Sequence, residues 1–153
     1  MTLKRRAFLI TAAALILFGA LHRPVHADPR EVFAPGGIAL DGFDPVAYFQ
    51  EGRAVEGDES HVLKWRGAMW YFSSAEAMEA FEMNPGAYAP QYGGFCAVSA
   101  AEGSVSASDP TVFVIHEGRL YLIASGGGRN AFMQDLASYI ARADANWKEL
   151  AGR

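Results

Sequence analysis

The hydrophobic residues of this chain follow two different spacings, which predict short strands in some segments and helices in others. Four short runs are rich in β-favouring residues, and they form two pairs around turns that contain glycine. Two such runs on either side of a short turn predict a β-hairpin. The sequence therefore predicts two hairpins, with strands at 61–65 and 69–72 and at 111–116 and 119–124.

A helical pattern follows each predicted hairpin. After the first, Ser73 or Ser74 is placed to cap a helix that buries Phe81 and ends at 84–85, Asn-Pro. After the second, a glycine run at 126–128 leads into what we predict to be the longest helix. Its apolar residues recur at three- and four-residue steps: Phe132, Leu136, Tyr139, Ile140, Ala143 and Trp147.

Weaker signals fill the rest of the chain. Residues 38–40 predict a short strand, Asp44 is expected to cap a short helix at 46–50, and the small residues of 99–109 predict a loop. No internal repeat is visible. The order hairpin, helix, hairpin, helix predicts an α+β fold, in which a small antiparallel sheet of two hairpins packs with a central helix and a long C-terminal helix.

The first 27 residues have the pattern of an export signal. Basic residues at 4–6 precede an uncharged apolar stretch at 7–21, and small residues at 25 and 27 suit cleavage after Ala27. The apolar stretch is shorter than the roughly 20 residues that a membrane-spanning helix needs. We therefore expect a signal peptide at 1–27, a single domain at 28–153, and a periplasmic or otherwise exported bacterial-type protein.

The start of this signal also resembles the twin-arginine motif, with paired arginines followed by Phe8 and Leu9. Proteins that use this route are exported already folded. An ordinary secretory signal and an uncleaved N-terminal tether are the alternatives.

Cleavage would change the charge of the protein. The whole chain has 13 basic and 17 acidic residues and a formal charge of −4. All the acidic residues but only nine basic ones lie in 28–153, which gives that part a charge of −8. This sign argues against nucleic acid and anionic lipid as partners. No stable membrane insertion is expected once the signal is cleaved.

Cys96 is the only cysteine of the chain. A lone thiol is unusual in an exported protein, because cysteines in oxidising compartments normally form disulfides. The thiol is therefore expected to be buried, bridged to another molecule or chemically active. Gly93 and Gly94 precede it and allow two interpretations. Their N–H groups could form a nest that favours a thiolate, or the glycines could serve a tight turn.

Five segments, the central one at 67–74 (Gly-Ala-Met-Trp-Tyr-Phe-Ser-Ser), carry motifs that together resemble the YHS domain. The segment 67–74 is similar to the core signature of that family, and the segments outside the core are similar to its exported, longer branch. The resemblance covers nearly all of residues 37–150 and indicates a YHS-domain protein. The matching segments keep one order along the chain: 38–49, 67–74, 90–97, 118–122 and 143–147.

The resemblance implies a connection to metals, because short YHS domains accompany heavy-metal transporters and other metal-handling proteins. Cysteines are the expected metal ligands in those domains. The matching positions of this chain are Ala47, Ser73 and Ala77, which offer no thiolate. Soft-metal or redox chemistry would therefore depend on Cys96 alone.

Three interpretations of function stay open. The protein could bind or sense a small ligand or a metal, copper or zinc, through Cys96 with His61 or His116. It could instead be a thiol-based redox protein, with Cys96 as the catalytic nucleophile and one of these histidines as its base. In the third interpretation Cys96 is buried in a structural or interaction domain, and both histidines lie at the surface. The protein partner, and whether the chain is an enzyme, stay open.

Overall fold

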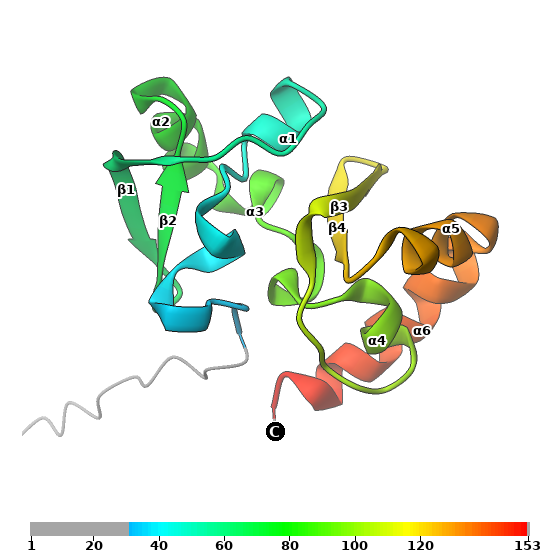
Figure 1. The fold of residues 1–153 in the computed structure, drawn as a ribbon. Helices are drawn as coiled ribbons and strands as arrows, with labels where there is room; N and C mark the ends of the chain where they lie inside the picture. The colour runs from blue at the N-terminus through cyan, green and yellow to red at the C-terminus, as the bar shows by residue number, and fades with distance from the viewer. Residues whose placement is uncertain (1–30, 153) are drawn as a thin grey trace, which may run out of the picture.

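The computed structural model describes residues 31–152 as two lobes that lie side by side (Figure 1). The predicted signal peptide at 1–27 lies outside the described residues. The first lobe contains α1 (Ala47–Gln50), β1 (Asp58–Trp65), β2 (Ala68–Phe72), α2 (Ala75–Met83) and α3 (Pro85–Tyr88). The second lobe contains α4 (Ala97–Ala101), β3 (Asp109–His116), β4 (Arg119–Ile123), α5 (Gly126–Gln134) and α6 (Leu136–Leu150). Short 3₁₀ turns lie ahead of α1 and α4: η1 (Pro35–Gly37), η2 (Ala39–Gly42) and η3 (Gln91–Gly94).

The predicted α+β fold is confirmed, including its antiparallel hairpins and its long C-terminal helix. β1 pairs with β2 around Arg66 and Gly67, and β3 pairs with β4 around Glu117 and Gly118. The two hairpins do not join into one sheet, because each forms a two-stranded sheet of its own. The first hairpin buries one face within its own lobe, whereas β4 of the second hairpin is buried on both faces.

Local sequence signals set the ends of α2, as predicted. The Ser74 hydroxyl accepts a hydrogen bond from the Ala77 N–H at 3.1 Å, which satisfies one of the free donors of the first turn. The helix stops at Asn84, whose backbone is non-helical, directly ahead of Pro85. Proline disfavours a helical conformation in the residue before it.

The long C-terminal helix begins later than predicted, because a separate helix, α5, precedes it in the same segment. The glycines at 126–128 form the first turn of α5, where the Ser125 hydroxyl accepts from the Gly128 N–H at 3.2 Å. At Asp135 the backbone leaves the helical region, with φ −143° and ψ 57°, and α6 begins at the next residue. The helical spacing of apolar residues continues across Asp135, so the sequence pattern does not indicate this break.

The strand predicted at 38–40 is wrong. Ile38 makes an isolated bridge to Met69, but the next residues turn sharply in η2. Leu40 and Asp41 have φ values of 55° and 49°, in the left-handed region. L-residues enter this region at a cost of roughly 1–2 kcal/mol, so tertiary packing must hold the turn.

The second lobe repeats the first, a relation that the sequence analysis missed. The elements of β1, β2 and α2 have eight, five and nine residues, and those of β3, β4 and α5 have the same lengths. The two hairpins shift register at equivalent places, directly after Asp58 and after Asp109, 51 positions later. Ser74 and Ser125 cap the helices that follow.

The aromatic packing follows the same repeat. In the first lobe Trp70 of β2 lies against Phe81 of α2, with ring centroids 5.2 Å apart. In the second lobe Tyr121 of β4 lies against Phe132 of α5, with centroids 5.5 Å apart. Across residues 58–83 only five residues have an identical counterpart 51 positions later, which explains why the repeat is not visible in the sequence: Asp58, Gly67, Ser74, Ala80 and Phe81.

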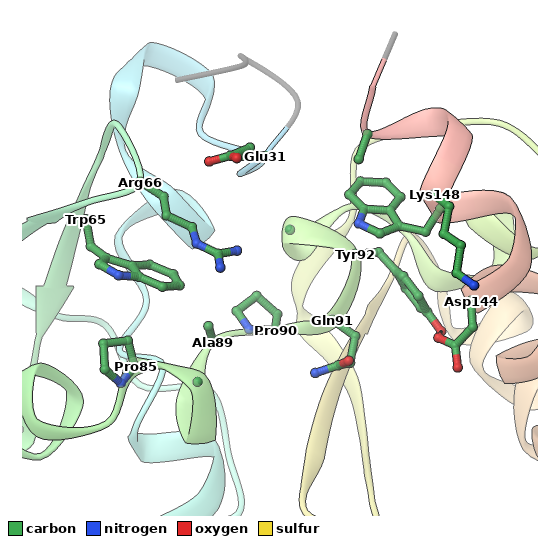
Figure 2. Close-up of a pocket in the computed structure, with 14 residues that line it drawn as sticks. Glu31, Trp65, Arg66, Pro85, Ala89, Pro90, Gln91, Tyr92, Asp144 and Lys148 are labelled. Atoms are coloured by element: carbon green, nitrogen blue, oxygen red, sulfur yellow. Dashed lines mark hydrogen bonds between the residues drawn. The ribbon is translucent and has the colours of Figure 1, made fainter. Parts of the chain in front are cut away.

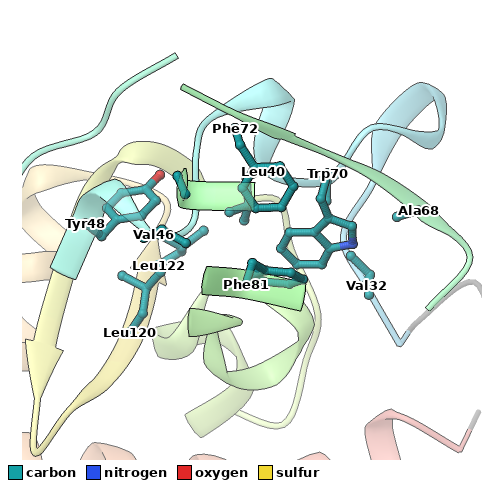
Figure 3. Packing of buried hydrophobic residues seen from close by; sticks show 12 residues of the cluster. Val32, Leu40, Val46, Tyr48, Ala68, Trp70, Phe72, Phe81, Leu120 and Leu122 are labelled. Carbon is teal, nitrogen blue, oxygen red and sulfur yellow. The ribbon is translucent and has the colours of Figure 1, made fainter. Parts of the chain in front are cut away.

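The buried side chains form two clusters, one under each hairpin. The first is built around Trp70, Phe72 and Phe81, and Figure 3 shows that Leu120 and Leu122 of β4 extend into it from the second lobe. The Tyr48 hydroxyl also donates to the Pro110 carbonyl at 2.8 Å. The lobes are therefore joined by apolar packing and by a hydrogen bond. The second cluster contains Cys96 and lies between α4, β4, α5 and α6.

Among residues 31–152, no helix is both long enough and apolar enough to cross a bilayer.

Candidate functional site

Cys96 lies in the core of the second lobe, with 2% of its surface exposed. It precedes the first residue of α4, where its carbonyl accepts a hydrogen bond from the Ala100 N–H at 3.0 Å. Its neighbours in the cluster are apolar or aromatic, including Tyr121, Phe132 and Ile140. Free cysteine is commonly buried as a small hydrophobic residue. The position of Cys96 fits this role.

The glycines ahead of Cys96 serve a turn and a close backbone approach. Gly93 and Gly94 have φ values of 60° and 86°, which glycine adopts without strain. The N–H of Phe33 donates to the Gly93 carbonyl at 2.8 Å, so the N-terminal segment crosses directly over η3. A Cβ at Gly93 would collide with the carbonyl of Glu31. The tight-turn interpretation of these glycines therefore has a structural reason.

Asp44 is the counterpart of Cys96 in the first lobe. Each follows a left-handed turn and a phenylalanine, and each precedes a short helix. The Asp44 N–H donates to Val55 at 2.8 Å, and the Cys96 N–H donates to the equivalent Ser106 at 3.1 Å. The same backbone frame therefore holds a carboxylate in one lobe and a thiol in the other.

The Asp44 carboxylate is fully buried and ties together two helix starts. One oxygen accepts from the Val46 N–H at 2.8 Å, and the other accepts from the N–H and hydroxyl of Ser73 at 2.9 and 2.6 Å. Sequence reasoning predicted the local cap at 46–50 but missed the bond to Ser73. Burying a carboxylate requires such partners.

The two histidines lie in different lobes and are partly exposed, whereas the thiol is buried. His61 is on β1, where the Ser60 hydroxyl lies 3.2 Å from its Nδ1. His116 ends β3, with its Nε2 at 3.9 Å from the Glu117 carboxylate and its side chain 39% exposed. Within 31–152, no three His, Cys, Asp or Glu side chains gather in a way that could hold a metal ion. The structure thus does not bring together Cys96, His61 and His116 as a site for copper or zinc.

A cleft of about 930 Å³ lies between the lobes, at a place that sequence reasoning did not find. Figure 2 shows Trp65 and Arg66 on one side, Tyr92 and Asp144 on the other, and a floor that includes Pro90 between them. Its volume is within the range of small-molecule sites in proteins, about 300–1,000 Å³. The complete lining is Glu31, Trp65, Arg66, Pro85, Gly86, Ala89, Pro90, Gln91, Tyr92, Gly93, Asp144, Trp147, Lys148 and Ala151.

Aromatic packing fixes both walls of this cleft. The Trp65 ring meets Phe81 edge-on at 5.4 Å, which anchors it to the first core. Trp147 of α6 lies 5.8 Å from Tyr92 and 5.9 Å from Phe95, measured between ring centroids. Both indoles are half-buried, so each keeps part of its surface for a ligand.

Two polar side chains of the cleft are hydrogen-bonded to each other. The Tyr92 hydroxyl donates to the Asp144 carboxylate at 2.8 Å. Burial, reinforced by this hydrogen bond and by the charge of Asp144, raises the pKa of Tyr92 far above its ordinary value. The hydroxyl therefore stays protonated at neutral pH and keeps donating to the carboxylate.

No family model, curated protein or solved structure matches this chain. The resemblance to the YHS family therefore stays a prediction from the sequence motifs.

Proposed function

We propose that this protein is an exported small-molecule-binding module of the YHS type and that its site is the cleft between the lobes. The observation that carries the proposal is the lining, in which two anchored indoles, Trp65 and Trp147, share one cavity with the charged Arg66. Binding sites for small molecules typically combine apolar walls with a few placed polar groups. The elements that meet there come from both lobes, so the fold itself builds the cavity.

Cys96 has a structural role in this proposal. Its burial among apolar side chains supports the structural interpretation of the thiol over the nucleophilic one, because a reactive cysteine needs partial exposure. Ligand binding in the cleft requires neither a metal nor the thiol. Cys96→Ser is accordingly expected to leave the affinity for a cleft ligand unchanged.

The three tryptophans make this proposal directly testable by NMR. In a spectrum of ¹⁵N-labelled protein, each indole N–H gives one signal, and the signal of Trp70 is expected to move less because Trp70 is buried and does not line the cleft. A library of small aromatic compounds is expected to contain ligands that move the signals of Trp65 and Trp147 most. A library in which no compound moves them would contradict the proposal.

A matched pair of glycine variants locates the binding site. Gly86 lines the cleft and Gly127 lies in α5, and at both positions a Cβ meets no atom closer than 3.7 Å. Gly86→Phe fills the cleft and is expected to weaken binding at least about tenfold, whereas Gly127→Phe is expected to leave it unchanged. Equal effects of the two substitutions would place the ligand elsewhere.

A further inference from the structure

We infer that the cleft takes a small organic anion with a flat aromatic body, and that Arg66 binds its carboxylate or phosphate group. This inference rests on the proposed function and names the class of ligand. It is carried by the position of one guanidinium and by the charges around it.

Arg66 is held so that its guanidinium extends into the cleft (Figure 2). It occupies the first position of the hairpin turn, with φ 47°, and its Cζ lies 4.5 Å from the centroid of the Trp65 ring. This cation–π contact orients the guanidinium but uses none of its N–H donors. Among the described residues no carboxylate lies within ion-pair distance of Arg66. Its planar fork of donors matches a carboxylate or phosphate.

The repeat indicates that the fold does not require arginine here. The second hairpin makes the same turn with Glu117, whose φ is 48°, at the position equivalent to Arg66. Glu117 has the opposite charge and pairs with Arg119 of its own hairpin at 3.6 Å. The turn thus forms with either charge, and the cation of the first lobe needs an explanation outside turn geometry.

Arg66 and Lys148 are the cations of the cleft lining, and Glu31 and Asp144 are its carboxylates. Asp144 accepts the Tyr92 hydroxyl and is followed by Lys148 one helical turn later on α6. Glu31, at the opposite side of the mouth from α6, is the remaining carboxylate (Figure 2). A cationic ligand would face the guanidinium of Arg66, whereas an anion gains from it. Glu31 and Asp144 oppose an anion, and Lys148 offsets part of their charge.

The walls favour a flat apolar body for the rest of the ligand. Trp65 and Trp147 present indole surface, and Pro85 and Pro90 add rigid apolar surface between them. Aromatic rings pack well against such surfaces, gaining more than their area alone provides.

The test compares three probes of one shape and different charge: 2-naphthoate, 2-naphthylmethanol and 2-naphthylmethylammonium. Affinities are measured by calorimetry, and the site is checked by the indole signals of Trp65 and Trp147. We expect 2-naphthoate to bind at least about tenfold more tightly than the other two, as one charge-assisted hydrogen-bonded pair provides.

Charge variants then identify the residue responsible. Arg66→Gln is expected to weaken 2-naphthoate binding about tenfold or more, and Glu31→Gln is expected to strengthen it. Arg53→Gln is the matched control, because Arg53 is an exposed arginine that pairs with Glu51 outside the cleft. Circular dichroism of each variant verifies that the fold is kept.

The outcomes separate this inference from the proposed function. If all three probes move the two indole signals with similar affinity, or if Arg66→Gln and Arg53→Gln have equal effects, the anion inference is overturned while the cleft stands as a binding site. If neither these probes nor the wider library moves the signals, both are overturned.

Discussion

Two buried tyrosines differ in whether the hydroxyl has a hydrogen-bond partner. Tyr48 and Tyr121 are both fully buried, but the Tyr48 hydroxyl donates to Pro110 at 2.8 Å. The Tyr121 hydroxyl has no hydrogen-bond partner among residues 31–152. A buried polar group without a partner loses its hydration and gains nothing in return. The Tyr48 hydroxyl is therefore expected to stabilise the fold, whereas the Tyr121 hydroxyl is expected to destabilise it.

We expect Tyr48→Phe to lower the free energy of unfolding by about 1 kcal/mol, since it removes a net-favourable hydrogen bond. Tyr121→Phe is expected to leave it unchanged or to raise it, because it removes only an unpaired hydroxyl. Urea denaturation of the two variants beside the parent protein measures both values. An equal loss in the two variants would mean that the Tyr121 hydroxyl finds a partner in solution.

Asp44 and Cys96 show where sequence reasoning at single residues stops. The cap at the start of α1 was predictable because Asp44 lies only two residues from Val46, whose N–H donates to the Asp44 carboxylate. The hydrogen bond from Ser73 to Asp44 was not predictable, because it joins residues 29 positions apart. The role of Cys96 was open for the same reason, since its burial depends on α5 and α6 packing around it.

At the scale of elements, local signals were sufficient wherever a residue acts on its near neighbours. Both hairpins and the serine cap of α2 were predicted, because turn glycines and caps act within a few residues. The left-handed turn at Leu40 was missed, because leucine rarely adopts a positive φ. Tertiary contacts, including the bridge from Ile38 to Met69, hold that turn.

The crossing of the N-terminal segment over η3 gives a prediction at this scale. Gly36 and Gly93 have similar φ values, 68° and 60°, but only at Gly93 would a Cβ meet other atoms. Gly36→Ala is expected to lower the free energy of unfolding by about 1 kcal/mol, because alanine is strained at a positive φ. Gly93→Ala is expected to lower the free energy of unfolding by about 3 kcal/mol or more, because the backbone at Glu31 must also move.

Urea denaturation of the two alanine variants provides the measurement. Similar losses would contradict the prediction, since they would mean that the segment at 31–33 moves away from η3 at no cost. The pair separates backbone conformation from steric contact, because the substitution is the same at both positions.

At the scale of the whole molecule, the cleft was not predictable because it is assembled from distant parts of the chain. Its lining comes from Glu31, the first hairpin turn, the connection at 85–93 and the end of α6. The repeat was hidden by the divergence of its side chains, although strand lengths and bulges are kept. The same divergence places Arg66 in one turn and Glu117 in the other. Only the first of the two turns lines the cleft, and the opposite side comes from Tyr92 and α6.

The shared core predicts that the lobes unfold together. Leu122 belongs to β4 of the second lobe, but its fully buried side chain packs in the first cluster. Leu122→Ala is expected to lower the free energy of unfolding by about 2–5 kcal/mol, and the Trp70 and Trp147 indole signals are expected to lose intensity at one urea midpoint. Met83→Ala is the control, because Met83 is 81% exposed and its truncation should change stability by less than about 0.5 kcal/mol. Separate midpoints for the two signals would show that the inter-lobe contacts contribute little, since each lobe would then unfold alone.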